Sequence, residues 1–288
     1  MSETTSVVVE GRKLKLSSLD KLLFPSTETT KGEVLNYYAQ VAEVLLPHLA
    51  SRPVTRVRWP HGTGDQSFFE KNVPSGAPSW LPRVRIDDVT YPLVEDLAQL
   101  TYLVNLNSIE LHVPQWKVDD EGTRHHPDRL VIDLDPGTGA GLRECAQVAV
   151  MVRDRLAEIG LEMFPVTSGS KGMQLYAALS GDLSSDQTRD LTQQLAQELT
   201  KKHPELVVWK MTKSLRPGKI FLDWSQNVAA KTTICPYSLR GKETPTVAAP
   251  RTWDEVEAGA SGKKLEQLMF DEVLDRLDAD GDLVADLL

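Results

Sequence analysis

Two aspartates stand one residue apart in the apolar run VIDLDPG, residues 131–137. If this run forms a β-strand, Asp133 and Asp135 project from the same face, about 6.6 Å apart along the chain. Carboxylates at that spacing repel each other unless a cation lies between them, and Mg²⁺ or Mn²⁺ binds carboxylate and phosphate oxygens together. The pair therefore predicts a divalent metal site, although an exposed D-x-D is more commonly only solvated charge.

A third aspartate strengthens this prediction. Asp223 closes a second short apolar run, KIFLDW at residues 219–224. Three carboxylates can hold two metal ions for phosphoryl transfer, with one ion at the attacking hydroxyl and the other at the leaving phosphate. Asp223 is also the one acidic residue among seven basic ones between residues 209 and 242. This cationic band favours a polyanionic partner despite the net charge of −9, because a local field matters more than the total.

A glycine-containing turn, TSGSKG at residues 167–172, separates two short apolar runs. Gly169 and Gly172 permit close backbone approach, and Ser168 and Lys171 with exposed amides would form an anion cradle. The spacing is not that of a Walker A loop. The alternative is an ordinary hairpin turn with a solvent-exposed lysine.

Further candidate donors of hydrogen bonds to phosphate lie on both sides of Asp223 in the sequence. Arg240 suits bidentate binding of phosphate and Lys231 suits a point charge, with Gln226 nearby. Surface charge is the alternative for the basic residues. His112 faces away from the apolar residues of its own run, and a structural role is the alternative for it.

Two other segments suggest contact with nucleic acid. Basic residues alternate with aromatic residues between residues 56 and 71, a pattern that suits stacking on an unpaired nucleobase. The alternative is that the phenylalanines belong to the core. The loop from residue 21 to residue 31 leads into a helix start, where a terminal phosphate is readily bound. The candidate DNA contacts are Lys21, Lys31, Arg56, Phe68, Phe69 and Lys71.

Helices and strands alternate without a regular rhythm. Apolar periodicity predicts helices over residues 30–49, 94–107, 141–159, 186–202 and 263–274. Strands are predicted at residues 55–59, 110–114, 130–135, 164–167, 174–178 and 219–224. We therefore predict an α+β fold with largely antiparallel sheets flanked by helices.

The chain is long enough for a substantial core and carries no obvious linker. We predict one domain over residues 1–288, with an N-terminal loop and helix (1–50), a catalytic core (51–250) and an acidic helical segment (251–288). The two cysteines form no C-x-x-C pair, so neither a disulfide framework nor a structural zinc site is indicated. No apolar run approaches a membrane span or a signal peptide, and we predict a cytoplasmic, nucleoid-associated protein without membrane contact.

The ordered set of motifs resembles a known family. VIDLDPG, FPVTSGSKG, FLDWSQN, KTT and PYSLRG, preceded by FFEK and HVPQW, resemble the polymerase domain of bacterial ligase D, a member of the archaeo-eukaryotic primase superfamily. The resemblance covers residues 16 to 274. It implies a primase-polymerase core and a template-directed nucleotidyltransferase. Such an enzyme extends primers, fills short gaps and adds nucleotides at DNA double-strand breaks in non-homologous end joining.

Roles carry over to the residues that match the family motifs. The resemblance implies two-metal catalysis with Mn²⁺ or Mg²⁺, metal ligands Asp133, Asp135 and Asp223, and a nucleotide site formed by His112, Ser168, Lys171, Arg216, Gln226, Lys231 and Arg240. Lys21 and Lys31 would bind a DNA 5′-phosphate, and Phe68 and Phe69 would stack at the template base. Gln174 replaces the usual histidine of the family, which predicts weaker binding of nucleotide because glutamine cannot become cationic.

The implied partners are DNA with a 5′-phosphate, at gaps or broken ends, and NTP or dNTP substrates. A Ku-like end-binding protein and a DNA ligase are implied as well, and the chain has no Lys-x-Asp-Gly motif of its own for ligation. Three other functions stay open at this point. They are a primase that starts chains without a primer, a D-x-D glycosyltransferase, and a catalytically weak module that bridges DNA ends.

Overall fold

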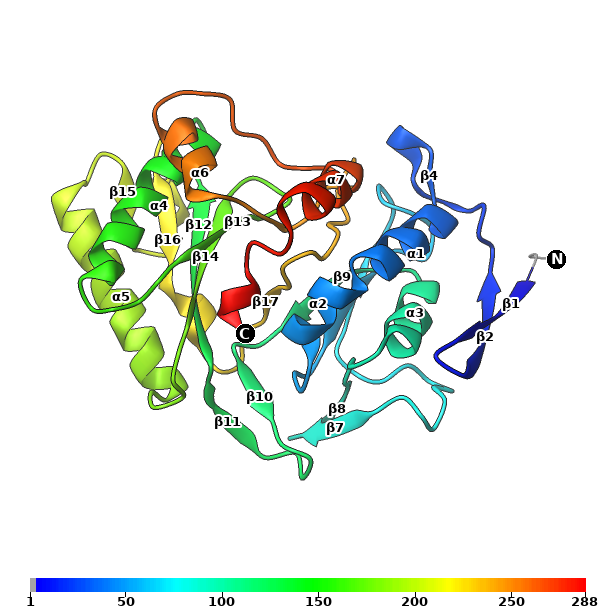
Figure 1. Ribbon diagram of the computed structural model, residues 1–288. Coiled ribbons are helices and arrows are strands. Elements are labelled where there is room, and N and C mark those ends of the chain that lie inside the picture. Colours follow the sequence, from blue (N-terminus) through cyan, green and yellow to red (C-terminus); the bar gives the residue numbers. More distant parts are fainter. Residues whose placement is uncertain (1–3) are drawn as a thin grey trace.

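A six-stranded sheet forms the centre of the computed structural model, which describes residues 4–288 (Figure 1). All its neighbouring strands pair antiparallel except β15 and β16, which are parallel. Its spatial order is β15 (Val207–Val208), β16 (Ile220–Asp223), β12 (Arg129–Pro136), β14 (Met173–Ala178), β13 (Phe164–Thr167) and β18 (Ala249–Pro250).

A second, antiparallel sheet lies beside it. Its strands are, in order, β17 (Thr233–Ile234), β9 (Ser108–Val113), β5 (Thr55–Arg58) and β6 (Phe68–Glu70). Four two-stranded hairpins surround the two sheets. They are β1 (Thr4–Val9) with β2 (Arg12–Ser17), β3 (Leu22–Phe24) with β4 (Thr29–Thr30), β7 (Arg83–Ile86) with β8 (Val89–Pro92), and β10 (Trp116–Val118) with β11 (Arg124–Pro127).

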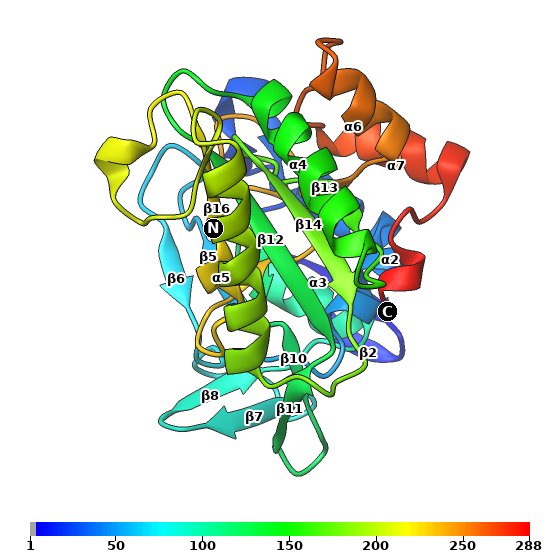
Figure 2. The same ribbon diagram turned by 90° about the vertical axis from the view of Figure 1, so that its left-hand side faces the viewer.

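The central sheet has a hydrophobic core on each face. Helices α4 (Leu142–Ala157) and α5 (Ser185–Lys202) lie across one face (Figure 2), over the buried Leu130, Ile132 and Leu134. Val131 points to the opposite face and joins a larger core. Strand β12 thus has one apolar face, whereas its other face carries the buried Arg129, then Val131, and then Asp133 and Asp135.

The larger core lies between the two sheets and the N-terminal helices. It includes residues from α1 (Lys31–Gln40), α2 (Ala42–Leu49) and α3 (Leu97–Asn105) (Figure 1). Thr30 caps α1, since its hydroxyl accepts from the amide of Glu33 while the Glu33 carboxylate accepts from the Thr30 amide at 2.7 Å. The single helix predicted through residue 49 is divided at Val41.

The C-terminal segment differs from the prediction of a helix over residues 263–274. Two helices, α6 (Trp253–Ala260) and α7 (Phe270–Asp280), flank a loop that contains residues 263–268. Capping interactions determine where α6 begins and ends. Thr252 and Glu255 form a capping box at its start, and Gly262 has a positive φ beyond its end. The Glu272 carboxylate accepts from the Met269 amide at the start of α7.

Short 3₁₀ helices complete the chain: η1 (Pro25–Thr27), η2 (Lys213–Leu215), η3 (Trp224–Asn227) and η4 (Ala285–Leu287). Within residues 4–288, no helix combines the length and apolar character needed to span a membrane. The predicted α+β class with largely antiparallel sheets is confirmed. The subdivision of the chain at residues 50 and 250 stays a prediction, and residues 1–3 of its first part lie outside the described residues.

Candidate active site

Strand register brings the three aspartates together. Asp133 of β12 pairs directly with Asp223 of β16, and Asp135 lies two residues further along the same face. One carboxylate oxygen from each residue lies within 4.8 Å of the others. On its other side Asp133 pairs with Gln174 of β14, so the amide and the carboxylates share one face of the sheet.

The cluster is electrostatically strained. Desolvation, followed by repulsion from Asp135 and Asp223, raises the pKa of Asp133 well above its usual range. Desolvation and the charge of Asp223 also raise the pKa of Asp135, while Arg216 and Arg240 lower it in part. A hard divalent cation fits this site, because all the clustered ligand atoms are carboxylate oxygens and their mutual repulsion is what a cation would relieve.

Hydrogen bonds fix the orientation of Asp223 at the start of η3. Its Oδ1 accepts from the amide of Ser225 at 3.0 Å and from the Ser225 hydroxyl at 2.6 Å. Its Oδ2 accepts from Gln226 Nε2 at 3.1 Å. Gln226, predicted to contact nucleotide, therefore holds a metal-ligand candidate in place.

A pocket of about 310 Å³ opens beside the carboxylates. Several elements distant in sequence contribute to it, and together they bring basic and acidic side chains to one pocket. It is lined by Asp133, Asp135, Pro136, Ser168, Ser170, Lys171, Gly172, Gln174, Arg216 and Arg240. Of the predicted nucleotide contacts, Ser168, Lys171, Gln174, Arg216 and Arg240 thus meet at one site.

The turn after β13 is built for close backbone approach. Ser168 Oγ accepts from the amides of Ser170 at 3.3 Å and Gly172 at 3.2 Å. A Cβ atom at Gly172 would overlap the carbonyl oxygen of Leu134, so only glycine lets the turn lie against β12. The turn is also braced from the C-terminal loop, since Gln267 accepts from Gly169 N at 2.6 Å and donates to Gly172 O at 2.9 Å.

Arg216 reaches the pocket through a second close approach. Its guanidinium carbon lies 3.6 Å from the centroid of the Phe221 ring, where a cation–π contact is favourable. A side chain at Gly137, just after β12, would overlap the carbonyl group of Arg216. Glycine at the end of VIDLDPG is therefore what brings the basic loop against the strand that carries the aspartates.

Three predicted nucleotide contacts lie outside the pocket lining as the described residues form it: Gln226, which holds Asp223, and Lys231 and His112. Lys231 is exposed beyond η3. The Nε2 of His112 donates to the Glu110 carboxylate at 2.8 Å, and the ring centroid of His112 lies 6.2 Å from that of Phe69. His112 is thus placed between the pocket and the exposed aromatics of β6.

The DNA-contact candidates of the second sheet divide into exposed and buried residues. Phe68 and Phe69 expose 43% and 58% of their surface, which removes the alternative that they are core residues. Lys71 and Phe69 line a separate pocket of about 600 Å³. Arg56, by contrast, is completely buried and pairs with Glu70 at 2.9 Å, so its contact with DNA stays a prediction that its burial disfavours. Its guanidinium instead pairs with the Glu70 carboxylate on the neighbouring strand β6.

Lys21 and Lys31 meet at the start of α1. The amide of Lys31 donates to the carbonyl of Lys21 at 2.7 Å, and the Lys31 ammonium donates to Ser17 O, also at 2.7 Å. The ammonium of Lys21 donates to the carbonyl of Pro60. Burial, and then the charge of Lys21, lower the pKa of Lys31 to about 8.

Sequence reasoning overlooked Glu110, Gln267 and Lys242. Glu110 shares the strand face of His112, a period-two signal that would have found it. Lys242 is close enough to Arg240 and Lys171 for these cations to lower its pKa, after desolvation. Nothing in the local sequence marks Gln267, because its partners are about a hundred residues away.

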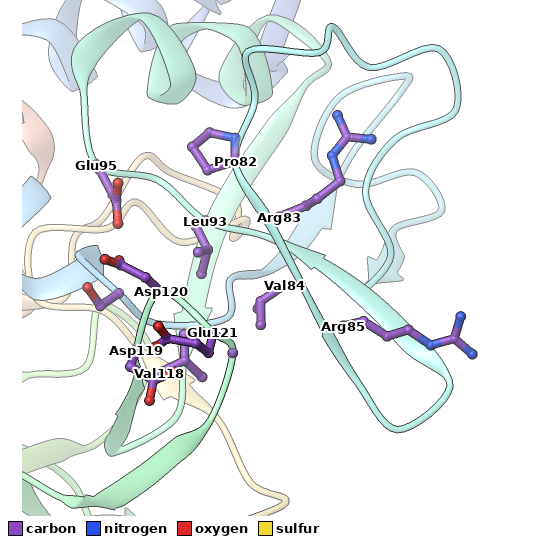
Figure 3. Close-up of a pocket in the computed structure, with 12 residues that line it drawn as sticks. Pro82, Arg83, Val84, Arg85, Leu93, Glu95, Val118, Asp119, Asp120 and Glu121 are labelled. Atoms are coloured by element: carbon purple, nitrogen blue, oxygen red, sulfur yellow. The ribbon is translucent and has the colours of Figure 1, made fainter.

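The β7–β8 and β10–β11 hairpins enclose another pocket, of about 430 Å³. Figure 3 shows the carboxylates of Glu95, Asp119 and Asp120 gathered on one side, while Arg83 and Arg85 extend away from them. None of the residues predicted to bind metal, nucleotide or DNA lines it.

Comparison with known proteins gives a consistent result along nearly the whole chain. The model of the family described as "LigD, primase-polymerase domain" matches residues 30–284. The multifunctional non-homologous end joining protein LigD of Mycolicibacterium smegmatis is 50% identical over 279 residues, which are 96% of this chain and 36% of that protein. The bifunctional LigD of Bacillus subtilis is 36% identical over 270 residues, covering 93% of this chain and 43% of that protein.

A solved structure agrees with these relatives. The polymerase domain from Mycobacterium tuberculosis ligase D, in complex with DNA, superimposes with a TM-score of 0.91 at 48% sequence identity. The match covers 95% of this chain and 97% of the solved one. The chain spans little more than a third of the length of the mycobacterial relatives it matches.

Proposed function

Because the chain belongs to the LigD primase-polymerase family, and is therefore a DNA-directed nucleotidyltransferase, we propose that it repairs broken DNA ends. It extends a primer along a template, fills short gaps and adds nucleotides at double-strand breaks in non-homologous end joining. The observation that carries this proposal is the cluster of Asp133, Asp135 and Asp223, with carboxylate oxygens within 4.8 Å, facing a pocket lined by basic residues.

The three aspartates are the metal ligands in this proposal, with Mn²⁺ or Mg²⁺ as the ion. When bound, the metal supplies activation of the primer hydroxyl and neutralises charge on the transferred phosphate. Ser168, Lys171 and Arg240 bind the triphosphate in the pocket that they share with the aspartates of β12. The turn at residues 168–172 adds backbone amides to this anion site.

The DNA lies across the second sheet and the start of α1. Phe68 and Phe69 stack at the template base, since both are exposed on β6, and Lys71 contacts the backbone. Lys21 and Lys31 bind the 5′-phosphate on the far side of a gap, where their mutual repulsion would be relieved by an anion. Arg216, Gln226, Lys231 and His112 complete the nucleotide side.

The other partners follow from the family rather than from any contact. A Ku-like end-binding protein recruits the chain to broken ends, and a DNA ligase seals the product. We place this work in the cytoplasm, at the nucleoid. The relatives whose names state a role in end joining are considerably longer than this chain. The proposal about these partners is the same whether the chain acts as a domain of a longer protein or as a separate protein.

Extension of a labelled primer across a short gap tests the proposal. Substrates with and without a downstream 5′-phosphate would be incubated with NTPs or dNTPs and with Mn²⁺ or Mg²⁺, using wild type beside the Asp133→Ala/Asp135→Ala variant. We expect templated extension that needs the aspartates and increases with the 5′-phosphate. Synthesis without a primer would instead identify a primase. DNA binding without extension would identify an end-bridging module.

A further inference from the structure

Glu110 lies at the junction of the nucleotide pocket and the second sheet. It projects from β9, is only 6% exposed, and has both carboxylate oxygens occupied. Oε1 accepts from Arg240 Nε at 3.1 Å and from the amide of Gly241 at 3.0 Å, and Oε2 contacts His112 Nε2 at 2.8 Å. One buried carboxylate thus contacts two residues to which the proposed function gives a nucleotide-binding role.

The charge state of Glu110 is fixed by these contacts. Burial would raise the pKa of its carboxyl group, but the hydrogen bond with His112 and the charge of Arg240 outweigh burial and lower the pKa to about 2. Glu110 is therefore ionised at neutral pH. Its charge stands close to the site of a triphosphate, which is itself an anion.

Arg240 is held at two points by this arrangement. Its Nε donates to Glu110, and its Nη1 donates to the carbonyl oxygen of Ser168 at 3.1 Å. The guanidinium is planar, so two fixed nitrogens determine the position of the third, and Nη2 takes part in neither bond. Arg240 lines the pocket in this orientation, together with Lys171 and the two aspartates of β12, whose raised pKa values its charge lowers in part.

We propose that Glu110 is a positioning residue for nucleotide binding, which holds Arg240 and His112 in the orientation that meets the triphosphate. The inference rests on the proposed function. A free arginine side chain loses conformational freedom when it binds phosphate, whereas an arginine already fixed by Glu110 has lost that freedom on folding. Glu110 therefore strengthens triphosphate binding although its own charge repels the ligand.

These two effects of Glu110 have opposite signs, and Glu110→Gln separates them. The amide keeps the size of the side chain and removes the charge. If repulsion dominated, the variant would bind nucleotide more tightly. Because we infer that positioning dominates, we expect KM for nucleotide in primer extension to rise about tenfold while kcat stays within about twofold.

Glu255→Gln is a matched control for a purely structural carboxylate. Glu255 pairs with Arg251 at 2.9 Å and with Arg276 at 2.8 Å, and it does not line the nucleotide pocket within the described chain. We expect it to lower Tm and leave KM unchanged. The inference about Glu110 is overturned if Glu110→Gln behaves in the same way, or if it lowers KM.

A double-mutant cycle identifies Arg240 as the residue through which Glu110 acts. Arg240→Met should raise KM, and adding Glu110→Gln should then raise it little further, because the oriented group is gone. Full additivity of the two effects on KM contradicts the inference. The increase in KM caused by Arg240→Met alone is the reference value for this comparison.

Calorimetric binding of inorganic tripolyphosphate with Mn²⁺ separates failure of this inference from failure of the proposed function, because it needs no catalysis. Weaker tripolyphosphate binding by Glu110→Gln supports the inference even if wild type extends no primer, in which case the proposed function fails alone. Unchanged affinity, in a protein that does extend primers, overturns the inference and leaves the function standing.

Discussion

The aspartate cluster and the Lys21–Lys31 pair are two sites of crowded like charge, with opposite signs and different construction. In the first, burial and neighbouring carboxylates raise the pKa of Asp133. In the second, burial and the neighbouring ammonium lower the pKa of Lys31 to about 8. Both shifts disfavour the charged form, so each site is less stable empty than with a counter-charge bound. We infer that one awaits a cation and the other an anion.

The two sites differ in what fixes them. Strand pairing places Asp133 opposite Asp223, and a slip of one residue in either strand would turn the aspartate of that strand to the other face. The lysines depend instead on a loop and a helix start: Lys31 lies within the capping box of α1, just after Thr30, while the carbonyl of Lys21 accepts a hydrogen bond from the Lys31 amide. Register positions a metal ligand with little freedom, whereas the lysine site depends on a folded loop and can adjust to a flexible DNA end.

The largest expected effect comes from Asp133→Asn, which removes one charge and keeps the shape. Extension should fall by about a thousandfold or more, because a metal ligand is lost. Without metal, the same variant should be more stable than wild type at neutral pH. A raised folded-state pKa costs stability above the unfolded pKa and costs nothing below it, so the gain should vanish in acid.

Thermal unfolding from pH 4 to pH 8, with and without Mn²⁺, measures this second effect. Mn²⁺ should raise the Tm of wild type and do so far less for Asp133→Asn. A metal-free Tm at pH 8 that is unchanged or lower in the variant would show that the carboxylates are not crowded as described.

Lys31→Gln acts on the other site, and it also removes the hydrogen bond that Lys31, which is only 2% exposed, donates to Ser17 O. Stimulation of extension by a downstream 5′-phosphate should fall about tenfold, the amount typical of losing one charge-assisted contact, while extension on unphosphorylated gaps should stay the same. Lys13→Gln, on the exposed side of β2, is the control. Equal loss on both substrates would mean that Lys31 supports the fold or the primer instead of the phosphate.

The pKa of Lys31 predicts a pH dependence for the same site. Stimulation by the 5′-phosphate should decrease as pH rises through about 8, where Lys31 loses its proton. Stability should move the other way: the unfolded chain keeps this proton up to its usual pKa of 10.5, so the free energy of unfolding rises with pH between about 8 and 10.5. The ratio of rates on phosphorylated and unphosphorylated gaps from pH 6.5 to pH 9.5 provides the measurement. A flat ratio in wild type, or the same slope in Lys31→Gln, contradicts the assignment.

The contrast in construction also explains what the sequence predicts well. The alternation of side chains along a strand predicted which face carries each of the three aspartates, because a strand determines its own side-chain directions. The motifs around the aspartates also carried the family resemblance. Long-range packing was not predictable in this way. Arg56 lies in a basic-aromatic pattern typical of nucleic-acid contact, yet its pairing with Glu70 buries it. Glu110 finds Arg240 only because β9 and the segment after β17 pack together, 130 residues apart in sequence.

The smallest expected effect concerns Gln174, a neutral residue among charged ones. It is 4% exposed, accepts a hydrogen bond from the Tyr176 hydroxyl at 3.0 Å, and pairs with Asp133 across the strands. Its hydrogen bond partly offsets the repulsion that raises the pKa of Asp133. Glutamine therefore moderates the aspartate cluster without adding a positive charge toward the triphosphate.

Gln174→His tests whether a cation at this point would improve the site. Histidine is protonated below about pH 6.5, and a charge beside the pocket should lower KM for nucleotide a few-fold at pH 6 and by less at pH 8. Gln147→His on α4, outside the pocket, is the control for an added histidine. If KM does not change at either pH, the basic residues already present set nucleotide binding, and the neutral residue at 174 serves the carboxylates only. A lower KM at pH 6 would show that the nucleotide site, like the lysine pair, is limited by how much positive charge it can hold.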